Sequence, residues 1–218
     1  MRNQRRDSPQ RFLEQWENAS GALPQGPFKY DLEIIRAIEE QNAALKAFAV
    51  RHPFSPEQLA ELRRHKITQG QEHEVFVPER PRAGSLVWKV TKPDRWGLRR
   101  ATPREYLIRL ARLDANSNTD IRVKGVATAP NGDPLLVTTM RYVRGTHPDG
   151  ALLDARLQAA GWEPTREKDY PTIATYRHKT DDTLMLDAHR LNFILTTSGH
   201  LVPIDIIFIG LGRFDVRI

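Results

Sequence analysis

Short β-rich segments separated by turn residues fill most of the chain from Lys66 onward, and they constrain its fold more than any other feature. Their alternating apolar and polar residues predict strands in the first half of this region at 68–77, 85–90, 121–127 and 134–143. A helix is expected at 103–114, because its apolar residues recur on one face. Two pairs of strands flanking one helix predict an α+β fold built on an antiparallel sheet.

The second half of the region mixes one helix with shorter strands. The helix is expected at 151–160, where Gly161 ends it. Strands are predicted at 170–176, 183–186, 193–196 and 201–208. Ser198 and Gly199 supply the turn between the last two strands.

The part of the chain before Lys66 has a different character. Residues 30–50 carry apolar side chains at helical spacing, and Pro53 stops that helix. Ser55, followed by Pro56, then predicts the start of a second helix that ends near residue 64. The expected parts are a flexible arm at 1–28, a helical extension at 29–65, and two lobes at 66–143 and 144–218.

Composition excludes several classes of protein. Hydrophobic residues make up 39% and charged residues 28%, which is ordinary for a globular chain. No window approaches the roughly 18 uninterrupted apolar residues of a membrane span, and no apolar segment follows the charged N-terminus, so neither a span nor a secretory signal is expected. The absence of cysteine excludes disulfides and thiolate metal sites and fits a cytoplasmic protein.

Positive charge is concentrated in the middle of the chain. Residues 51–100 contain eleven Lys and Arg against six Asp and Glu, a net +5 of the total +6. The residues that form this basic region are Arg63, Arg64, Lys66, Arg80, Arg82, Lys92, Arg95, Arg99 and Arg100. Such a region attracts a polyanion, which can be a nucleotide, a nucleic acid or an acidic protein, or it forms a solvated face.

Three polar residues near the C-terminus have the spacing of a phosphotransfer site. Asp187 and Asn192 lie in one short loop, and Asp205 follows 13 residues beyond Asn192, within the predicted strand 201–208. Phosphoryl transfer needs a carboxylate to orient the acceptor hydroxyl and oxygen ligands for Mg²⁺. Apolar runs at 193–195 and 201–204 flank the intervening turn, so a hairpin can return Asp205 toward Asn192. His189 and Arg190, in the same loop, are candidates for contact with acceptor or phosphate.

Two upstream residues complete the pattern. Lys89 lies in the strand 85–90, where an ammonium can hold nucleotide phosphates. Glu105, in the helix that comes next, can reach back and pair with it. We therefore expect Asp187, Lys89 and Glu105 as catalytic residues and Asn192 and Asp205 as metal ligands.

Several segments together resemble a known family. They are Gly70–Val75, Trp88–Thr91, Tyr106–Leu110, Gly161–Trp162, Asp187–Phe193 and Gly199–Asp205. In these segments the chain resembles the kinase domains found in bacterial and phage polyvalent proteins, a compact branch of the kinase-like superfamily. The likeness runs from about residue 66 to 208, with the last two segments the most specific.

The resemblance implies a bilobal fold, ATP and Mg²⁺ as ligands, and a hydroxyl acceptor on a protein or a small molecule. Lys89 and the turn at Gly70 would face the phosphates. The segment 140–143 would be the hinge between the lobes, where backbone groups of Met140 and Tyr142 would receive the adenine.

The sequence also departs from that family's pattern. The turn at 69–74 has one glycine, and Glu72 and Glu74 place negative charge there. Ile206 follows Asp205 where protein kinases have Phe-Gly, and the sequence ends at Ile218, so the expected C-terminal lobe is truncated. Two functions stay open: an ATP-dependent phosphotransferase, or a kinase-fold binding module that engages a protein or nucleic acid through the basic region.

Overall fold

The computed structural model describes residues 7–26, 30–82, 84–97, 101–117, 119–168, 170–180 and 183–210. In these residues the protein is a mixed α+β fold with five α-helices and antiparallel sheets. The chain divides into two compact units. Unit 1 comprises residues 1–111 and 120–142, and unit 2 comprises 112–119 and 143–218. No helix in the described residues is long and apolar enough to cross a membrane.

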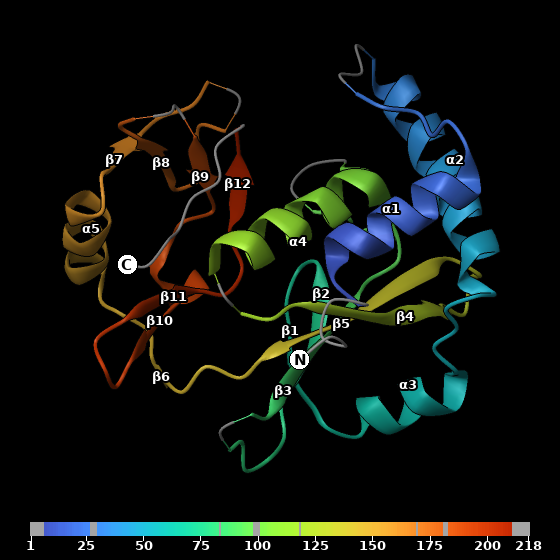
Figure 1. The fold of residues 1–218 in the computed structure, drawn as a ribbon, viewed down its shortest axis with the longest axis horizontal. Helices are drawn as coiled ribbons and strands as arrows, with labels where there is room; N and C mark the ends of the chain where they lie inside the picture. The colour runs from blue at the N-terminus through green and yellow to red at the C-terminus, as the bar shows by residue number, and fades with distance from the viewer. Residues whose placement is uncertain are drawn as a thin grey trace. The chain divides into compact units, whose positions relative to one another are not determined.

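Unit 1 is a five-stranded sheet with helices on both faces (Figure 1). Its helices are α1 (Pro9–Ser20), α2 (Asp31–Ala49), α3 (Pro56–Arg63) and α4 (Pro103–Ser117), whose last turn is grouped with unit 2. Its strands are β1 (Lys66–Gln69), β2 (His73–Phe76), β3 (Leu86–Thr91), β4 (Arg122–Thr128) and β5 (Pro134–Arg141). They are ordered β1-β2-β3-β5-β4, with every neighbouring pair antiparallel.

In the described residues of unit 2, one helix besides the last turn of α4 accompanies two small antiparallel sheets. The elements are β6 (Gly145–Thr146), α5 (Gly150–Ala159), β7 (Trp162–Thr165), β8 (Thr175–His178), β9 (Leu184–Leu186), β10 (Phe193–Thr196), β11 (Leu201–Pro203) and β12 (Ile207–Ile209). A three-stranded sheet has the order β11-β10-β6, and a four-stranded sheet has the order β12-β9-β8-β7. A single 3₁₀ turn at Arg190–Asn192 precedes β10.

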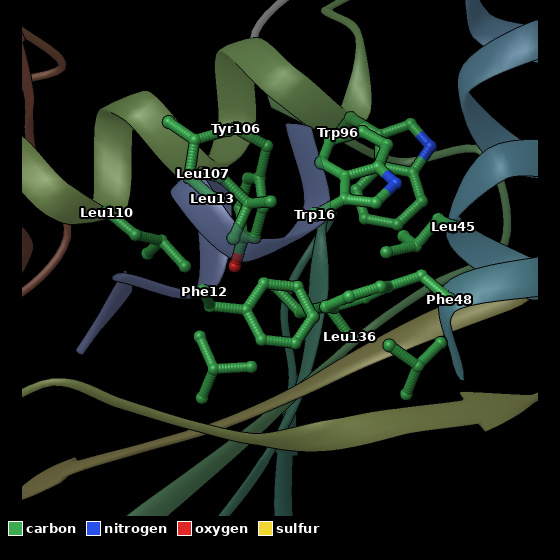
Figure 2. Packing of buried hydrophobic residues seen from close by; sticks show 12 residues of the cluster. Phe12, Leu13, Trp16, Leu45, Phe48, Trp96, Tyr106, Leu107, Leu110 and Leu136 are labelled. Atoms are coloured by element: carbon green, nitrogen blue, oxygen red, sulfur yellow. The ribbon is translucent and has the colours of Figure 1, made fainter. Parts of the chain in front are cut away.

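The main core of unit 1 lies where α1, α2 and α4 cover one face of the sheet (Figure 1). Figure 2 shows Trp16 of α1, Leu45 of α2 and Trp96 packed together in this cluster. Each is at most 2% exposed, and full burial of a large apolar side chain contributes about 1.5–3 kcal/mol. On the opposite face, Leu59 of α3 packs in a second cluster with residues of β2, β3, β4 and β5.

Helix α1 is part of this core, so the prediction of a flexible arm is wrong for residues 7–20. Ser8 caps the helix by accepting a hydrogen bond from the Arg11 N–H. Phe12 packs edge-on against Phe48 of α2, with ring centroids 5.3 Å apart. The carbonyl of Asp7 accepts a hydrogen bond from the Val123 N–H of β4. The arm and the helical extension therefore belong to the same packed unit as the sheet.

Three strand assignments in unit 2 need correction. The strand expected at 170–176 is β8, which begins only at Thr175 and ends at His178. The expected strand 201–208 is two strands, β11 and β12, because the chain bends at Ile204 and Asp205. Residues 162–165 form β7, which the sequence did not predict, since Pro164 argues against a strand. The proline is tolerated because β7 is at the edge of its sheet. The helices expected at 103–114 and 151–160 are present as α4 and α5.

Candidate functional site

Asp187 and Asn192 are joined by two hydrogen bonds in unit 2. The side-chain amide of Asn192 donates to the main-chain carbonyl of Asp187 at 2.8 Å and to its carboxylate oxygen Oδ2 at 2.9 Å. Both partners are acceptors, so the amide must direct its NH₂ group at Asp187. Its Oδ1 atom is then left to accept a hydrogen bond or to bind a cation. The spacing that the sequence suggested thus corresponds to a fixed geometry.

The local fold explains why this loop is held so firmly. Asp187 follows β9 and adopts a left-handed conformation, with φ of 59°. Ala188 is buried and its N–H donates to the Ala174 carbonyl at 2.9 Å. The Asn192 N–H donates to the His189 carbonyl at 2.9 Å, which closes the 3₁₀ turn, and Phe193 is fully buried. The loop is therefore anchored on both sides of the exposed residues 189–191.

Two strand pairings place Asp205 beside these residues. Strand β10 pairs with β11, and the Ile204 N–H donates to the Asn192 carbonyl at 2.9 Å. Strand β9 pairs with β12 in a register that sets Leu186 opposite Ile207. Residues 204–206 connect β11 to β12, so their main chain runs from the hydrogen bond with Asn192 to the strand that pairs with β9, which ends next to Asp187. The structure thus gathers Asp187, Asn192 and Asp205 at one place in unit 2.

Histidines add to this surface. The ring of His189 lies with Nε2 3.5 Å from Oδ1 of Asp187, while Oδ2 of the same carboxylate is held by Asn192. His147, which directly follows β6, places Nδ1 2.9 Å from the Phe193 carbonyl. No local sequence pattern points to His147, because β6 is very short and its pairing with β10 is long-range.

The side chains of this loop and of Asp205 include oxygen ligands of the kind that Mg²⁺ prefers. Among the described residues, no group of three or more His, Asp or Glu side chains is arranged to hold a metal. Mg²⁺ does not need such a group, since it is usually bound by one or two carboxylates with substrate phosphates and waters. The carboxylate of Asp205 and the amide oxygen of Asn192 are oxygen ligands of the required kind.

In unit 1, Lys89 and Glu105 do not form the expected pair. Lys89 is half-buried in the middle of β3, where it lies opposite Thr138 of β5. The carboxylate of Glu105 accepts a hydrogen bond from the Thr102 N–H at 2.8 Å, and Thr102 Oγ1 accepts from the Glu105 N–H at 3.3 Å. These reciprocal bonds form a capping box at the start of α4. Glu105 therefore caps its own helix.

The backbone groups expected to contact nucleotide are also engaged elsewhere. The Gly70 N–H donates to the His73 carbonyl at 2.9 Å, and the Lys92 ammonium donates to the Gly70 carbonyl. The Tyr142 N–H donates to the Ser85 carbonyl at 2.8 Å, so it is not a donor for adenine in this structure. Met140 is buried near the end of β5.

The acidic residues of the first turn are neutralised. Glu72 pairs with Arg109 of α4 at 2.8 Å, and the Arg109 side chain is only 8% exposed. Glu74 pairs with Arg63 of α3 at 3.0 Å. The negative charge that the sequence placed near the phosphates is therefore balanced by two arginines. Arg109 was not singled out from the sequence, where it is one polar residue in an amphipathic helix.

Some residues of the basic region form ion pairs of this kind. Arg63 and Arg64 pair with Glu74 and Glu61, at 3.0 and 2.7 Å. Exposed side chains that keep the positive character are Arg80, Arg82 and Arg95. Arg99, Arg100 and the side chain of Lys66 lie outside the described part of the chain.

An apolar pocket of about 400 Å³ also lies in unit 1, and no predicted site residue lines it. Its walls are formed by Leu62 and His65 near the end of α3, by residues 76–79 and by Trp88 of β3. Phosphates are commonly bound by lysine or arginine, and the residues that line this pocket include neither, only one histidine and the acidic Glu79. The pocket is therefore not a candidate for the nucleotide phosphates.

The predicted residues thus fall into two groups. Asp187, Asn192 and Asp205 are in unit 2, while Lys89, Glu105, Gly70, Met140 and Tyr142 are in unit 1. Comparisons with protein-family models, curated proteins and solved structures find no match to this chain. Its chemistry is therefore inferred from its own residues.

Proposed function

We propose that the protein is a kinase-like phosphotransferase that uses ATP and Mg²⁺ to phosphorylate a hydroxyl on a protein or a small molecule. One observation carries the proposal: the Asn192 amide holds both the carbonyl and the carboxylate of Asp187, next to the segment that contains Asp205. A carboxylate for the acceptor hydroxyl and an Asn–Asp pair for Mg²⁺ are the groups that protein kinases use for phosphoryl transfer.

Each residue has a distinct role in this proposal. Asp187 orients the acceptor hydroxyl and takes up its proton, and the hydrogen bond from Asn192 keeps the carboxylate aimed. Asn192 Oδ1 and Asp205 would hold Mg²⁺, which when bound neutralises charge on the phosphates. Lys89 would bind the phosphates as a cation. Glu105 has no role in this mechanism, because it caps helix α4.

The kinase-like bilobal arrangement is part of the same proposal. Unit 1 supports it with an antiparallel sheet whose third strand carries Lys89 and is followed by α4. Unit 2 supports it with the loop at 187–192 and the hairpin that leads to Asp205. In that arrangement the lobes would be 66–143 and 144–218, with residues 1–65 built onto the first.

Incubation with γ-labelled ATP, Mg²⁺ and a cell lysate tests the reaction. The wild type is expected to transfer label, whereas Asp187→Ala should lose transfer and keep its affinity for Mg·ATP in calorimetry. Asp205→Ala should lose the affinity itself, because it removes a charged metal ligand. Glu163→Ala, at an exposed carboxylate on β7 of the same unit, serves as the control and should transfer label. Undiminished transfer by Asp187→Ala would refute the assignment.

A binding module is the second candidate, and the turn at Gly70 favours it. The N–H and the carbonyl of Gly70 both form hydrogen bonds inside the protein, so neither group is left to bind phosphate. The exposed arginines 80, 82 and 95 would then engage an acidic protein or a nucleic acid. Nucleic-acid binding that falls steeply with salt would support this function, and binding that ignores salt would dismiss the nucleic-acid form.

A further inference from the structure

The apolar pocket of unit 1 lies on the face of the sheet opposite to Lys89. Trp88 and Lys89 are consecutive residues of β3, so their side chains point to opposite faces of the sheet. Trp88 packs against the cluster that includes Leu59 of α3, and Leu62 of the same helix packs there as well. The pocket is therefore separate from the position proposed for the nucleotide phosphates.

Aromatic side chains form the inner part of the pocket. Phe76 of β2 and Trp88 of β3 are directly opposite in the antiparallel pair, so both side chains lie on the same face. Phe76 is 1% exposed, whereas Trp88 is half-buried and has its ring centroid 6.0 Å from that of Phe54. Val77 and Pro78, which follow β2, line the pocket with them. Its volume of about 400 Å³ falls within the range of roughly 300–1,000 Å³ that small-molecule sites occupy.

One acidic residue lines this pocket. Glu79 is exposed, and it has no ion-pair partner among the residues that the structure describes. Arg64 and His65, at the end of α3, both lie beside Glu61, at 2.7 and 3.7 Å. The described lining contains no Lys or Arg, so the charge that it offers to a ligand is negative.

This lining selects an aromatic compound with a positive charge. The apolar walls gain by removing a ring from water, and the face of Trp88 attracts both a second ring and a cation. The carboxylate of Glu79 attracts an ammonium group and repels an anion. A nucleotide also has an aromatic base, but its phosphates would find no Lys or Arg in the lining, and Lys89 points to the other face.

We propose that this pocket binds a small aromatic amine, with its ring against Trp88 and its ammonium group toward Glu79. The site is additional to the proposed nucleotide site, and the inference does not depend on phosphotransfer. Because Trp88 and Lys89 face opposite sides of the sheet, the amine and Mg·ATP should bind the protein at the same time.

Three naphthyl compounds of similar size test the charge preference. Naphthylethylamine carries a cation, naphthylethanol is neutral and naphthylacetate carries an anion. In calorimetry the wild type should bind the amine about three- to fivefold more tightly than the alcohol, as expected for an exposed charge pair, and the acetate most weakly. Glu79→Gln should remove the preference for the amine and leave the affinity for the alcohol unchanged. Glu40→Gln, at an exposed carboxylate of α2, should retain the wild-type order.

Nuclear magnetic resonance locates the bound amine. The indole N–H signal of Trp88, assigned by its loss in Trp88→Phe, should shift on binding. The signal of Trp162, which is in unit 2, should not shift. Val77→Phe should fill part of the pocket and block the binding of all three compounds, and an unchanged Tm should show that this variant still folds.

Several results would overturn the inference. Tightest binding of the acetate would assign the pocket to anions attracted by Arg80, which follows Glu79 and is exposed. Equal affinity for the amine and the alcohol would remove the role of Glu79. A Trp88 signal that does not move, or binding that persists in Val77→Phe, would place the compounds elsewhere on the protein. Displacement of the amine by Mg·ATP would show that the nucleotide occupies the pocket.

Discussion

The orientation of the Asp187 carboxylate is fixed by the backbone conformation and by hydrogen bonds. Its left-handed conformation, with φ of 59°, costs roughly 1–2 kcal/mol for most residues with a side chain and is best tolerated by Asn and Asp. The Asp187 carbonyl offsets this by accepting from the His189 N–H at 2.9 Å and from the Asn192 amide. Backbone conformation and hydrogen bonds thus act together to aim one carboxylate.

The raised pKa of the Tyr176 hydroxyl predicts that the protein loses stability in alkaline solution. Burial raises the pKa of its hydroxyl well above the ordinary value, and the hydrogen bond to Asp154 together with the negative charge of that carboxylate raises it further. The folded protein therefore retains the proton where the unfolded chain releases it. The stabilisation is complete below about pH 10, the ordinary tyrosine value, and is lost as the pH rises beyond it.

Urea denaturation at about pH 8 and about pH 11 measures this effect. Wild-type protein should lose more unfolding free energy between the two conditions than Tyr176→Phe, which has no hydroxyl to titrate. Lysines also titrate in this range, so the difference between the two proteins is the relevant quantity. Equal losses would show that Tyr176 contributes nothing to the pH dependence.

Among the elements, α4 depends on its capping box. Glu105→Ala should destabilise the protein by about 0.5–1 kcal/mol in urea denaturation, because it leaves the Thr102 N–H without its acceptor. Glu105→Gln should retain the stability, since an amide oxygen can accept the same bond. Both variants should keep their Mg·ATP affinity. A loss of Mg·ATP affinity in Glu105→Gln would instead support the ion pair between Glu105 and Lys89 that the sequence suggested.

The buried face of helix α1 should contribute to the stability of the protein as other core residues do. Trp16→Ala is expected to reduce the unfolding free energy by about 3–5 kcal/mol, because the indole is fully buried among residues of α2 and α4. Arg11→Ala, on the exposed side of the same helix, should change it by less than about 0.5 kcal/mol. A mobile arm would make the two substitutions equally harmless in urea denaturation.

The sequence predicted local elements better than their docking. Periodic apolar spacing sufficed for α4 and α5, whose patterns are helical on their own. It could not show that Phe12 and Trp16 find partners on α2, since that contact depends on tertiary packing. The short strand β6 and the edge strand β7 carry no strong local pattern either.

At the scale of the whole molecule, Mg·ATP should stabilise the protein only when Lys89 and Asp205, the residues proposed to bind its phosphates and its metal, are both intact. Saturation at about 100 times Kd adds about 2.7 kcal/mol, or several degrees in Tm. Thermal unfolding of Lys89→Ala and of Asp205→Ala should show little or none of this increase, although the two residues belong to different units. Arg156→Ala should respond like the wild type. Full stabilisation in both variants would contradict the proposed nucleotide site.

The candidate site was predictable from the sequence only in part. The spacing of Asp187, Asn192 and Asp205 was informative because a hairpin between them follows from the flanking apolar runs. Spacing alone could not show that Glu105 closes onto Thr102, since the capping geometry exists only in the folded start of the helix. Nor could it show that the N–H groups of Gly70 and Tyr142 already have acceptors, because those acceptors are brought close by a turn and by strand pairing.

The buried tryptophans can serve as intrinsic fluorescence probes of unfolding. Trp16 and Trp96 are enclosed in unit 1, whereas Trp162 is the sole indole of unit 2, 2% exposed against the ring of His178. In a chain with phenylalanine at positions 16, 88 and 96, the tryptophan emission would come from unit 2 alone. Its emission would reveal whether the half that carries Asp187 melts together with the rest or on its own.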